Sequence, residues 1–240
     1  MGTQSEYEIW KSEGSGVLTE MPLIMAACKA GQIGSVFSYD GGAVYKTVFT
    51  YLCGEPDKDI VNKNPELIYE NRLVCMSAEW EEFIRSMPVK FTLRREVMAP
   101  FHSKSSKKIR PLPAGYTLTT FTPEIFSTHP FDHGRNYKDY QDFATRGAGA
   151  AVLFEGEVVS ASSSFLSYEG HVELDVFTEP DHRNKGLADH AVYEMLNQSY
   201  AKGLTVHWDA QNPMSSGMAV SHGLTPVSEY AVYWLAENKN

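Results

Sequence analysis

The hydrophobic and polar positions of this 240-residue chain change their period several times, and each change marks an expected element. GQIGSVFSYDGGAVYKTVFTYLCGE predicts two strands around the turn YDGGA, because Asp-Gly-Gly supplies positive φ between β-rich runs. SAEWEEFIRSM predicts a short helix that Ser77 caps and whose apolar face carries Trp80, Phe83, Ile84 and Met87. VKFTLRREV then alternates as a strand does. The first hundred residues therefore predict a packed α+β module without visible chemistry.

Residues 102–115, HSKSSKKIRPLPAG, are polar, basic and rich in proline. This composition predicts a linker. Its lysines could bind an anion, but a solvated linker is the favoured interpretation of so short a run of charge. We therefore expect an accessory α+β domain over residues 1–105, a linker over 106–114 and a second domain over 115–240.

The sequence of the second domain predicts strands and helices in the order β-α-α-β-β-β-α-β-α-β-β. GYTLTTFT is an alternating strand, and two short helices follow around TPEIFSTH and NYKDYQDFATRG. GAAVLFEGEVVSASSSFLSYEGHVELDVFTEP predicts three strands joined by Glu-Gly turns. A helix starts near Gly186 and ends with Lys202 in its last turn and Gly203 after it. LTVHWDA predicts a further strand, PMSSGMAVSHG a short helix, and LTPVSEYAVYWL a closing hairpin.

The stretch RNKGLA, residues 183–188, joins an apolar run to the start of that long helix. A helix N-terminus offers unpaired N–H groups and about half a unit of positive charge. A glycine lets backbone amides approach a phosphate, and Arg or Lys nearby adds charge. The stretch differs from the GxGxxG fingerprint of a Rossmann domain and lacks the Gly-Lys-Ser/Thr of a P-loop. It is therefore either a different phosphate-binding loop or an ordinary strand-to-helix turn.

Composition and charge narrow the class of protein. No apolar stretch approaches the roughly 20 residues that cross a bilayer, and a secretory signal is not visible, so we expect a cytoplasmic protein without membrane contact. Cys28, Cys53 and Cys75 are widely spaced and give neither a zinc signature nor a disulfide framework. Residues 1–110 carry 14 acidic and 14 basic side chains, whereas residues 111–240 carry 16 and 7 and hold the whole net charge of −9. An acidic half repels nucleic acid and attracts cationic molecules, although it can also serve solubility alone.

Residues 115–235 resemble the GNAT acetyltransferase superfamily. In that superfamily the fourth strand ends in an apolar run and a proline, followed by R/Q-x-x-G-x-G/A, and here the sequence is VFTEPDHRNKGLA. After the fifth strand an Asn and a Gly-hydrophobic pair often follow, here Asn212 and Gly223-Leu224 within NPMSSGMAVSHGL. The first half resembles only loosely the N-terminal module of some two-domain bacterial acetyltransferases. The resemblance implies an α+β fold with a mixed sheet flanked by helices, acetyl-CoA as cosubstrate and no metal.

The resemblance also implies which residues would bind acetyl-CoA. Backbone groups of Val176, Phe177 and Thr178 would pair with the pantetheine arm, and one amide there would polarise the thioester carbonyl. The Asn212 side chain would bond to the pantetheine as well. The pyrophosphate would be held by Arg183, Asn184, Lys185, Gly186, Leu187, Ala188 and Asp189, mainly through backbone amides. A merely structural turn is the alternative for these residues.

The chemistry needs a route for a proton, because an alkyl amine with a pKa near 10 is mostly protonated at pH 7. Some members of the superfamily use a glutamate on the fourth strand, but the matching position here is Val172. Others use a glutamate on the fifth strand, five residues before the Asn. That position here is His207, whose unperturbed pKa of about 6.5 suits a base. Asp209 shares its face and could orient it, while Glu173 and Asp175 are reserve candidates that would act through water. A strand histidine satisfied by packing is the alternative for His207.

The general acid is open, because the tyrosine of many members falls on Ala219. Its possible replacements are Ser221, His222, Tyr230 and Tyr233. A thiol with a pKa near 8.5 leaves as thiolate only about 2 kcal/mol uphill at pH 7, so an acid is not essential. The sequence thus predicts acetyl transfer from acetyl-CoA to a cationic amine, either a small molecule or a basic peptide. The alternatives are an acyl-CoA-binding regulatory module with little catalysis, or a scaffold whose first half does the binding; the oligomeric state is not readable.

Overall fold

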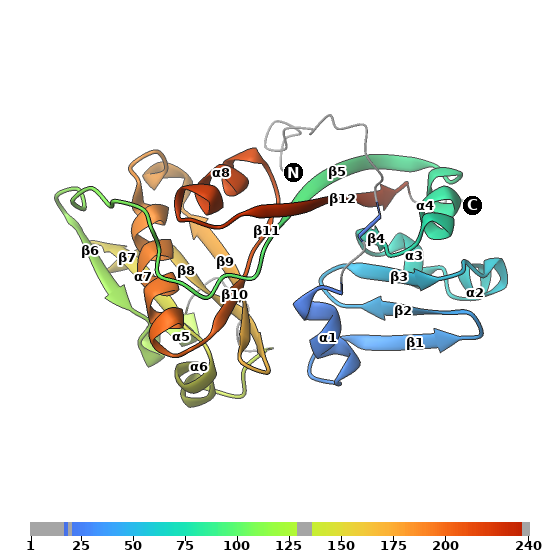
Figure 1. The fold of residues 1–240 in the computed structure, drawn as a ribbon, viewed down its shortest axis with the longest axis horizontal. Coiled ribbons are helices and arrows are strands. Elements are labelled where there is room, and N and C mark those ends of the chain that lie inside the picture. Colours follow the sequence, from blue (N-terminus) through green and yellow to red (C-terminus); the bar gives the residue numbers. More distant parts are fainter. Residues whose placement is uncertain (1–16, 19–20, 129–135, 237–240) are drawn as a thin grey trace. The chain divides into compact units, whose positions relative to one another are not determined.

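The structure is a computed structural model that describes residues 17–18, 21–128 and 136–236. The chain divides into two compact units (Figure 1). Unit 1 takes in Met1–Val97, Ala210–Ser216 and Val227–Asn240, and unit 2 takes in Met98–Asp209 and Gly217–Pro226. Both units combine a mixed sheet with helices, so the predicted α+β class is confirmed.

Unit 1 is built on a seven-stranded sheet in the order β1-β2-β3-β4-β12-β5-β11. Its first three strands form an antiparallel meander, β3 and β4 run parallel, and β12 pairs antiparallel with β4. The predicted turn after β1 is confirmed, with Gly41 at a φ of 89°. The elements, in chain order, are α1 (Leu23–Lys29), β1 (Ser35–Tyr39), β2 (Gly42–Lys46), β3 (Thr50–Gly54), α2 (Lys58–Lys63), α3 (Glu66–Tyr69), β4 (Leu73–Cys75), α4 (Ala78–Arg85), β5 (Val89–Met98), β11 (Asp209–Ala210) and β12 (Pro226–Leu235).

The predicted helix of unit 1 is α4, and its cap follows the sequence. The Ser77 hydroxyl accepts a hydrogen bond from the Trp80 backbone N–H, as an N-cap residue does. Trp80 and Ile84 are buried in a cluster that also contains Leu73 and Tyr233. The amphipathic pattern therefore faces the helix towards the core of unit 1 as expected.

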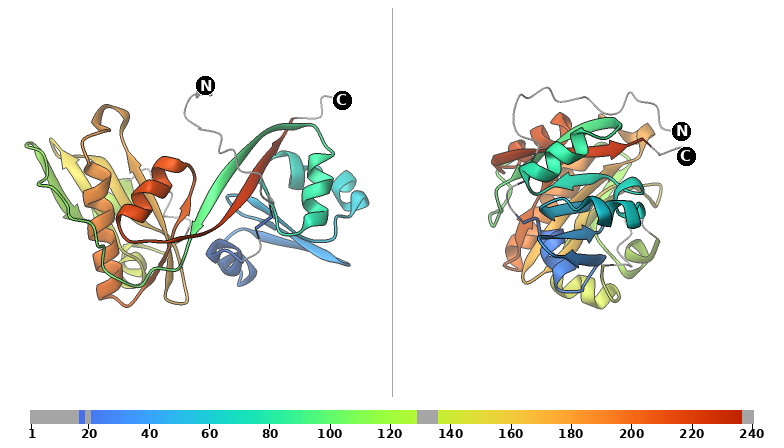
Figure 2. Two further views of the ribbon diagram at one scale, coloured as in Figure 1. Left: turned by 45° about the horizontal axis from the view of Figure 1, so that its top comes forward. Right: turned by 90° about the vertical axis from the view of Figure 1, so that its right-hand side faces the viewer.

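The predicted hairpin at the end of the chain is wrong, because LTPVSEYAVYWL forms the single strand β12. Tyr230, Ala231, Val232 and Tyr233 are all buried in succession. A strand buried on both faces reads as a continuous apolar run, which is also what half of a buried hairpin would show. In the left view of Figure 2, β12 runs beside β5, and in the sheet it lies between β4 and β5.

Unit 2 is built on a five-stranded sheet in the order β10-β9-β8-β7-β6, in which only β10 and β9 run parallel. The three predicted strands with Glu-Gly turns are confirmed, and Glu155, Gly156, Glu169 and Gly170 all have positive φ. The elements are β6 (Tyr116–Thr120), α5 (Pro123–Thr128), α6 (Tyr140–Arg146), β7 (Gly149–Phe154), β8 (Glu157–Tyr168), β9 (His171–Thr178), the 3-10 helix η3 (Pro180–His182), α7 (Leu187–Ala201), β10 (Thr205–His207) and α8 (Pro213–Ser221), which also reaches into unit 1.

Helices cover both faces of the sheet of unit 2. Phe143 of α6 and Ile125 of α5 pack with Ala151 on one face. Leu187 and Ala191 of α7 pack with Val152 on the other, since neighbouring strand residues point to opposite faces. The loop after β9 and the start of α7 are therefore held at the carboxyl end of β9.

The segment expected to be a linker, and Phe101 just before it, form hydrogen bonds and apolar contacts within unit 2. Phe101 exchanges two backbone hydrogen bonds with Val206, with N···O distances of 2.8 and 2.7 Å. The Ser106 N–H donates to the His222 carbonyl oxygen over 3.0 Å, and Leu112 packs against the cluster under α7. The compact units therefore follow other residue ranges than the expected domains, since β12 also returns to the sheet of unit 1. Charge and proline content do not reveal these apolar anchors.

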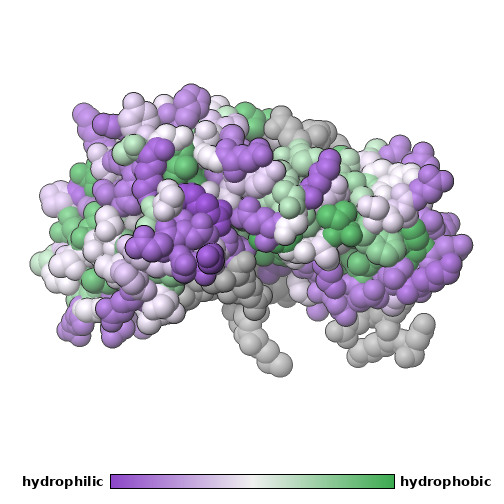
Figure 3. Space-filling view, turned by 90° about the horizontal axis from the view of Figure 1, so that it is seen from below, coloured by the Kyte–Doolittle hydropathy of each residue, from purple (hydrophilic) through white to green (hydrophobic). Residues whose placement is uncertain are grey.

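The hydropathy of the helices and of the surface bears on contact with membranes. In the parts of the chain that the structure describes, no helix is long and apolar enough to cross a membrane. Figure 3 shows one face on which hydrophobic residues form separate patches among hydrophilic ones.

Candidate active site

Strand β9 continues beyond the end of its neighbour β10. The parallel pairing joins Thr205 to His171 and His207 to Glu173, and there β10 ends. The rest of β9, up to Thr178, pairs with β8 on one side, and β10 does not follow it on the other. An unpaired strand edge presents N–H and C=O groups that a ligand can bind.

The register with β8 shows which groups face this open edge. The Glu179 N–H donates to the Val159 carbonyl oxygen over 2.8 Å, so this is a hydrogen-bonded pair. Such pairs alternate along antiparallel strands, so the N–H and C=O groups of Val176 and Thr178 point away from β8. Those of Phe177 point towards β8. Of the three residues expected to meet the pantetheine arm, two thus offer backbone groups at the open edge.

These outward groups carry local partners in the present structure. The Val176 N–H donates to the Asp175 carboxylate over 2.8 Å, and the Thr178 carbonyl oxygen accepts from the Arg183 Nε over 3.1 Å. Both contacts come from exposed side chains. A ligand at this edge would therefore exchange places with Asp175 and Arg183.

The loop after β9 holds its backbone in an unusual conformation. Asn184 has a φ of 62° and Gly186, the N-cap of α7, a φ of 75°. Within the described ranges, the backbone N–H groups of residues 184–189 find no acceptor. A Cβ added to Gly186 would meet no heavy atom within 4 Å, so the space beside this glycine is open. The loop is therefore a cluster of unused donors at a helix N-terminus.

Two exposed cations border this loop. Arg183 reaches back to β9, and Lys185 donates to the Asp181 carbonyl oxygen over 2.7 Å. The Lys185 ammonium also lies 6.0 Å from the centre of the Tyr116 ring. Their charge adds to that of the helix terminus, as the sequence predicted for an anion site.

Asp189, in the first turn of α7, has partners that sequence reasoning missed. Its carboxylate accepts from the Lys107 ammonium and lies 3.3 Å from the His222 Nε2. These hydrogen bonds, with that of His222 first, lower the pKa of Asp189 to about 2. His222 is fully buried, and its Nδ1 lies 2.8 Å from the Ser105 hydroxyl. The negative charge of Asp189 is thus compensated beside the loop. A local sequence pattern could not have predicted this contact, because Lys107 and Asp189 are 82 residues apart.

His207 lies at the last paired position of β10, beside the opening. Its Nε2 lies 2.8 Å from the Nδ1 of His171, a partner that the sequence did not suggest. Burial, and then the neighbouring His171, lower the pKa of His207 to about 4, well below the value expected from sequence. Alternation places His171, Glu173 and His207 on one face of the sheet, with Glu173 opposite His207 in the register.

The candidate general acids are held by other contacts. Ala219 is fully buried, and Tyr230 is 1% exposed. The Ser221 hydroxyl accepts from Lys107 over 2.8 Å, and the Tyr233 hydroxyl donates to Glu81 over 2.5 Å within unit 1. The Nε2 of His222 contacts the Asp189 carboxylate.

The structure brings the expected residues of β9, the loop, α7 and β10 together within unit 2. Asn212 belongs to unit 1, where its side-chain oxygen accepts from the Ser215 N–H over 2.9 Å and caps α8. Among the described residues, no group of three His, Cys, Asp or Glu side chains could hold a metal ion.

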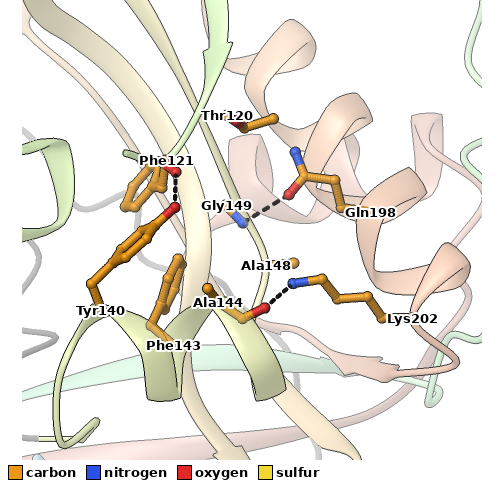
Figure 4. Close-up of a pocket in the computed structure, with 9 residues that line it drawn as sticks. All are labelled: Thr120, Phe121, Tyr140, Phe143, Ala144, Ala148, Gly149, Gln198 and Lys202. Carbon is orange, nitrogen blue, oxygen red and sulfur yellow. Dashed lines mark hydrogen bonds between the residues drawn. The ribbon is translucent and has the colours of Figure 1, made fainter. Parts of the chain in front are cut away.

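A separate cavity of about 230 Å³ lies in unit 2 between α6, β7 and α7 (Figure 4). Its polar groups serve the protein itself: the Gln198 side-chain oxygen accepts from the Gly149 N–H over 3.3 Å. The Lys202 ammonium likewise donates to the Ala144 carbonyl oxygen over 2.7 Å. None of the expected site residues lines this cavity, so we do not count it as part of the site.

Comparison with solved structures shows the same mixed α+β fold in acetyltransferase-like proteins. A GCN5-related N-acetyltransferase-like protein from Streptococcus suis 89/1591 superposes with a TM-score of 0.72 at 22% identity, over 90% of this chain and 93% of that one. A GCN5-related N-acetyltransferase from Kribbella flavida gives a TM-score of 0.57 at 14% identity, over 92% and 98% of the two chains.

Sequence comparison extends this likeness. A curated relative, the uncharacterized N-acetyltransferase YdfB of Bacillus subtilis (strain 168), is 29% identical over 146 residues. The match covers 58% of this chain and spans 56% of that relative. A model of the family described as GNAT acetyltransferase matches residues 18–233, which includes both units. The chain therefore belongs to the GNAT acetyltransferase family.

Proposed function

We propose that this protein transfers the acetyl group of acetyl-CoA to an amine. Membership of the family and the N-acetyltransferase relative support acetyl transfer in general. The observation that carries the proposal is the pairing of two features in unit 2. The open edge of β9 ends directly in a loop whose amides, from Asn184 to Asp189, have no acceptor among the described residues. An extended ligand with a diphosphate at one end fits that arrangement.

The residues present fit acetyl-CoA group by group. The outward C=O group of Val176 and the outward N–H and C=O groups of Thr178 would bond to the amides of the pantetheine arm. The amides of residues 184–189 would bind the diphosphate, with the exposed side chains of Arg183 and Lys185 beside it. The bound molecule supplies the acetyl thioester.

Groups of the chain itself would then stabilise the negative charge on the thioester carbonyl oxygen and accept the proton of the amine. The Val176 N–H would bond to the carbonyl oxygen on which negative charge develops, after Asp175 has released that N–H. His207 would hold the proton that leaves the amine. With a pKa of about 4 it is neutral at pH 7 and ready to accept. Taking a proton from an alkylammonium with a pKa near 10 would cost about 8 kcal/mol. The reacting nitrogen of the acceptor would therefore lose its first proton to water before it attacks, and His207 would accept the second proton, which becomes acidic as the C–N bond forms.

Acetyl-CoA should raise the melting temperature of the protein, because a ligand that binds only the folded state stabilises it. At a hundred times its Kd the expected gain is about 2.7 kcal/mol. Differential scanning fluorimetry measures the shift over a concentration series. S-acetylpantetheine, which lacks the diphosphate, is the control and should give a much smaller shift. An equal shift with both compounds, or none with acetyl-CoA at millimolar concentration, would contradict binding through residues 184–189.

A second candidate function is binding of an acyl-CoA as a regulatory signal. The low pKa of His207 and the buried Ala219 at the position of the family tyrosine favour it. Release of free CoA thiol in the presence of a panel of amines separates the two candidates. A protein that shows the thermal shift but no release with any amine would be the binding module.

The acceptor should carry positive charge, since Glu173 lies at the last position of β9 that pairs with β10, Asp175 lies on the open part beyond it, and residues 111–240 carry the whole net charge of −9. The value of kcat/KM for a polyamine or a lysine-rich peptide should then fall steeply between about 0.01 and 0.15 M salt, where the Debye length shrinks from roughly 30 to 8 Å. Steady-state kinetics at a series of salt concentrations checks this. A neutral amine of similar size is the control, and an acceptor whose kcat/KM ignores salt would show that the acidity serves solubility.

A further inference from the structure

His171 and His207 form a hydrogen-bonded pair of imidazoles beside the opening between β9 and β10. The Nδ1 of His171 lies 2.8 Å from the Nε2 of His207, and the ring centres are 5.1 Å apart. His171 is the first residue of β9 and follows the Glu-Gly turn, while His207 is the last residue of β10. Both rings are partly exposed. The contact joins strands that are distant in sequence, which explains why sequence reasoning overlooked His171.

The identity of the two bonded nitrogens limits the proton arrangement. A neutral imidazole carries one N–H, and one proton fills the space between the rings. If that proton is on the Nε2 of His207, its Nδ1 has a lone pair, and His171 carries its own proton on Nε2. If the proton is on the Nδ1 of His171, the Nδ1 of His207 carries the other proton, and His207 has no lone pair left for a substrate. A neutral pair therefore has both protons on Nε2 or both on Nδ1.

A neutral histidine side chain intrinsically favours the Nε2–H tautomer. In one of the two arrangements both rings are Nε2–H tautomers, so the preference of each ring favours that arrangement. We propose that His171 is a positioning residue that fixes His207 as the Nε2–H tautomer and leaves Nδ1 of His207 as the basic nitrogen of the site. Which nitrogen of a histidine is basic is commonly set by the hydrogen bond that the other makes. The proposal deepens the proposed function and rests on it.

The surroundings agree with a neutral pair that is ready to accept one proton. Burial and His171 lower the pKa of His207. The groups that face it are His171 and, opposite it in the strand register, Glu173, with Asp175 two residues further along β9. When the proton of the attacking amine arrives at Nδ1, the imidazolium keeps its Nε2–H bond to the His171 lone pair. That bond becomes charge-assisted and strengthens, and the proton later leaves from Nδ1 to water.

The first test reads the tautomer directly and needs no turnover. Long-range ¹H–¹⁵N correlation spectra of the full ¹⁵N-labelled chain at pH 7 report which ring nitrogens carry protons. We expect the Nε2–H form for both His171 and His207, and His171→Leu should remove the bias of His207 towards that form. A protonated Nδ1 on His207 in the unmodified protein would overturn the proposal.

The second test compares two replacements of His171. His171→Gln keeps an oxygen that can accept from the His207 Nε2–H, so it should retain most of kcat. His171→Leu should lower kcat by at least roughly 10-fold and leave the Kd for acetyl-CoA unchanged. The upper limit of the expected loss is roughly 10⁴-fold, which is the loss when a catalytic histidine is held in the wrong tautomer. His102→Leu, at an exposed histidine outside the site, is the matched control and should behave as the unmodified protein.

The outcomes separate this proposal from the proposed function. An unmodified protein that releases no CoA with any amine contradicts acetyl transfer, while the spectra still decide the tautomer. Equal kcat values for His171→Leu and the unmodified protein would overturn the positioning role even if acetyl transfer is established. Should His171→Leu fail to fold, the spectra of the unmodified chain and the Gln variant keep the test decisive.

Discussion

Replacement of His207 by alanine should lower kcat by roughly 10²- to 10⁴-fold, the usual cost of removing a general base. The Kd for acetyl-CoA should stay within about two-fold, because the diphosphate donors belong to residues 184–189. Single-turnover kinetics measures the chemical step, and isothermal titration measures the binding. A large loss in both quantities would indicate damage to the fold rather than to proton transfer.

The pH dependence of kcat/KM in the unmodified protein and in the His207→Ala variant shows in which protonation state His207 acts. His207 acts in its neutral form, and its pKa is lowered to about 4, so the unmodified protein should lose this contribution only as pH falls through about 4. Above that value kcat/KM should follow the deprotonation of the amine alone. A variant at His207 with the same kcat and the same pH–rate profile would show that the histidine only packs, and Glu173 would become the candidate base.

Replacement of Gly186 by aspartate should abolish binding of acetyl-CoA at micromolar concentration. Two unit charges 4 Å apart repel by about 4 kcal/mol at an effective dielectric constant of 20, which corresponds to a roughly thousand-fold weaker Kd. Gly186 has a φ of 75°, and Asp and Asn enter that region more easily than other side chains do. The added Cβ meets no neighbour within 4 Å, so the fold should persist.

Matched variants separate charge from shape in this experiment. Gly186→Asn has the same shape without the charge and should weaken binding far less than Gly186→Asp. Gly203→Asp places the same residue at a similar φ of 69° with equally open space, just beyond the other end of α7. It should bind acetyl-CoA as the unmodified protein does. If Gly186→Asp and Gly186→Asn bind alike, the phosphates contact another part of the chain.

Local patterns predicted the parts of the fold that local physics determines. The Glu-Gly pairs at 155–156 and 169–170 ended strands where predicted, because Gly accepts positive φ at little cost. The start of α7 at Leu187 after Gly186 followed from the same kind of signal. The position of the loop between β9 and α7 could therefore be predicted from the sequence alone.

The missed features all depend on pairing between distant residues. His171 and Lys107 find their partners 36 and 82 residues away, through strand register and through the anchored segment around Phe101. The pKa of His207 also depends on burial, which a residue type does not disclose. The final strand was misread because a doubly buried strand and a buried hairpin share one apolar pattern. No window of sequence contains such information.

The position of β12 has a consequence for the order in which the protein can be completed during synthesis. β12 fills the place between β4 and β5, yet β5 ends at Met98 and β12 begins at Pro226. At 5–20 residues per second the ribosome needs roughly 6 to 25 seconds to make the intervening chain. During that interval the neighbouring edges of β4 and β5 lack their partner, while the sheet of unit 2 is complete once His207 has emerged. The unit that is synthesised first is therefore the one whose sheet is finished last.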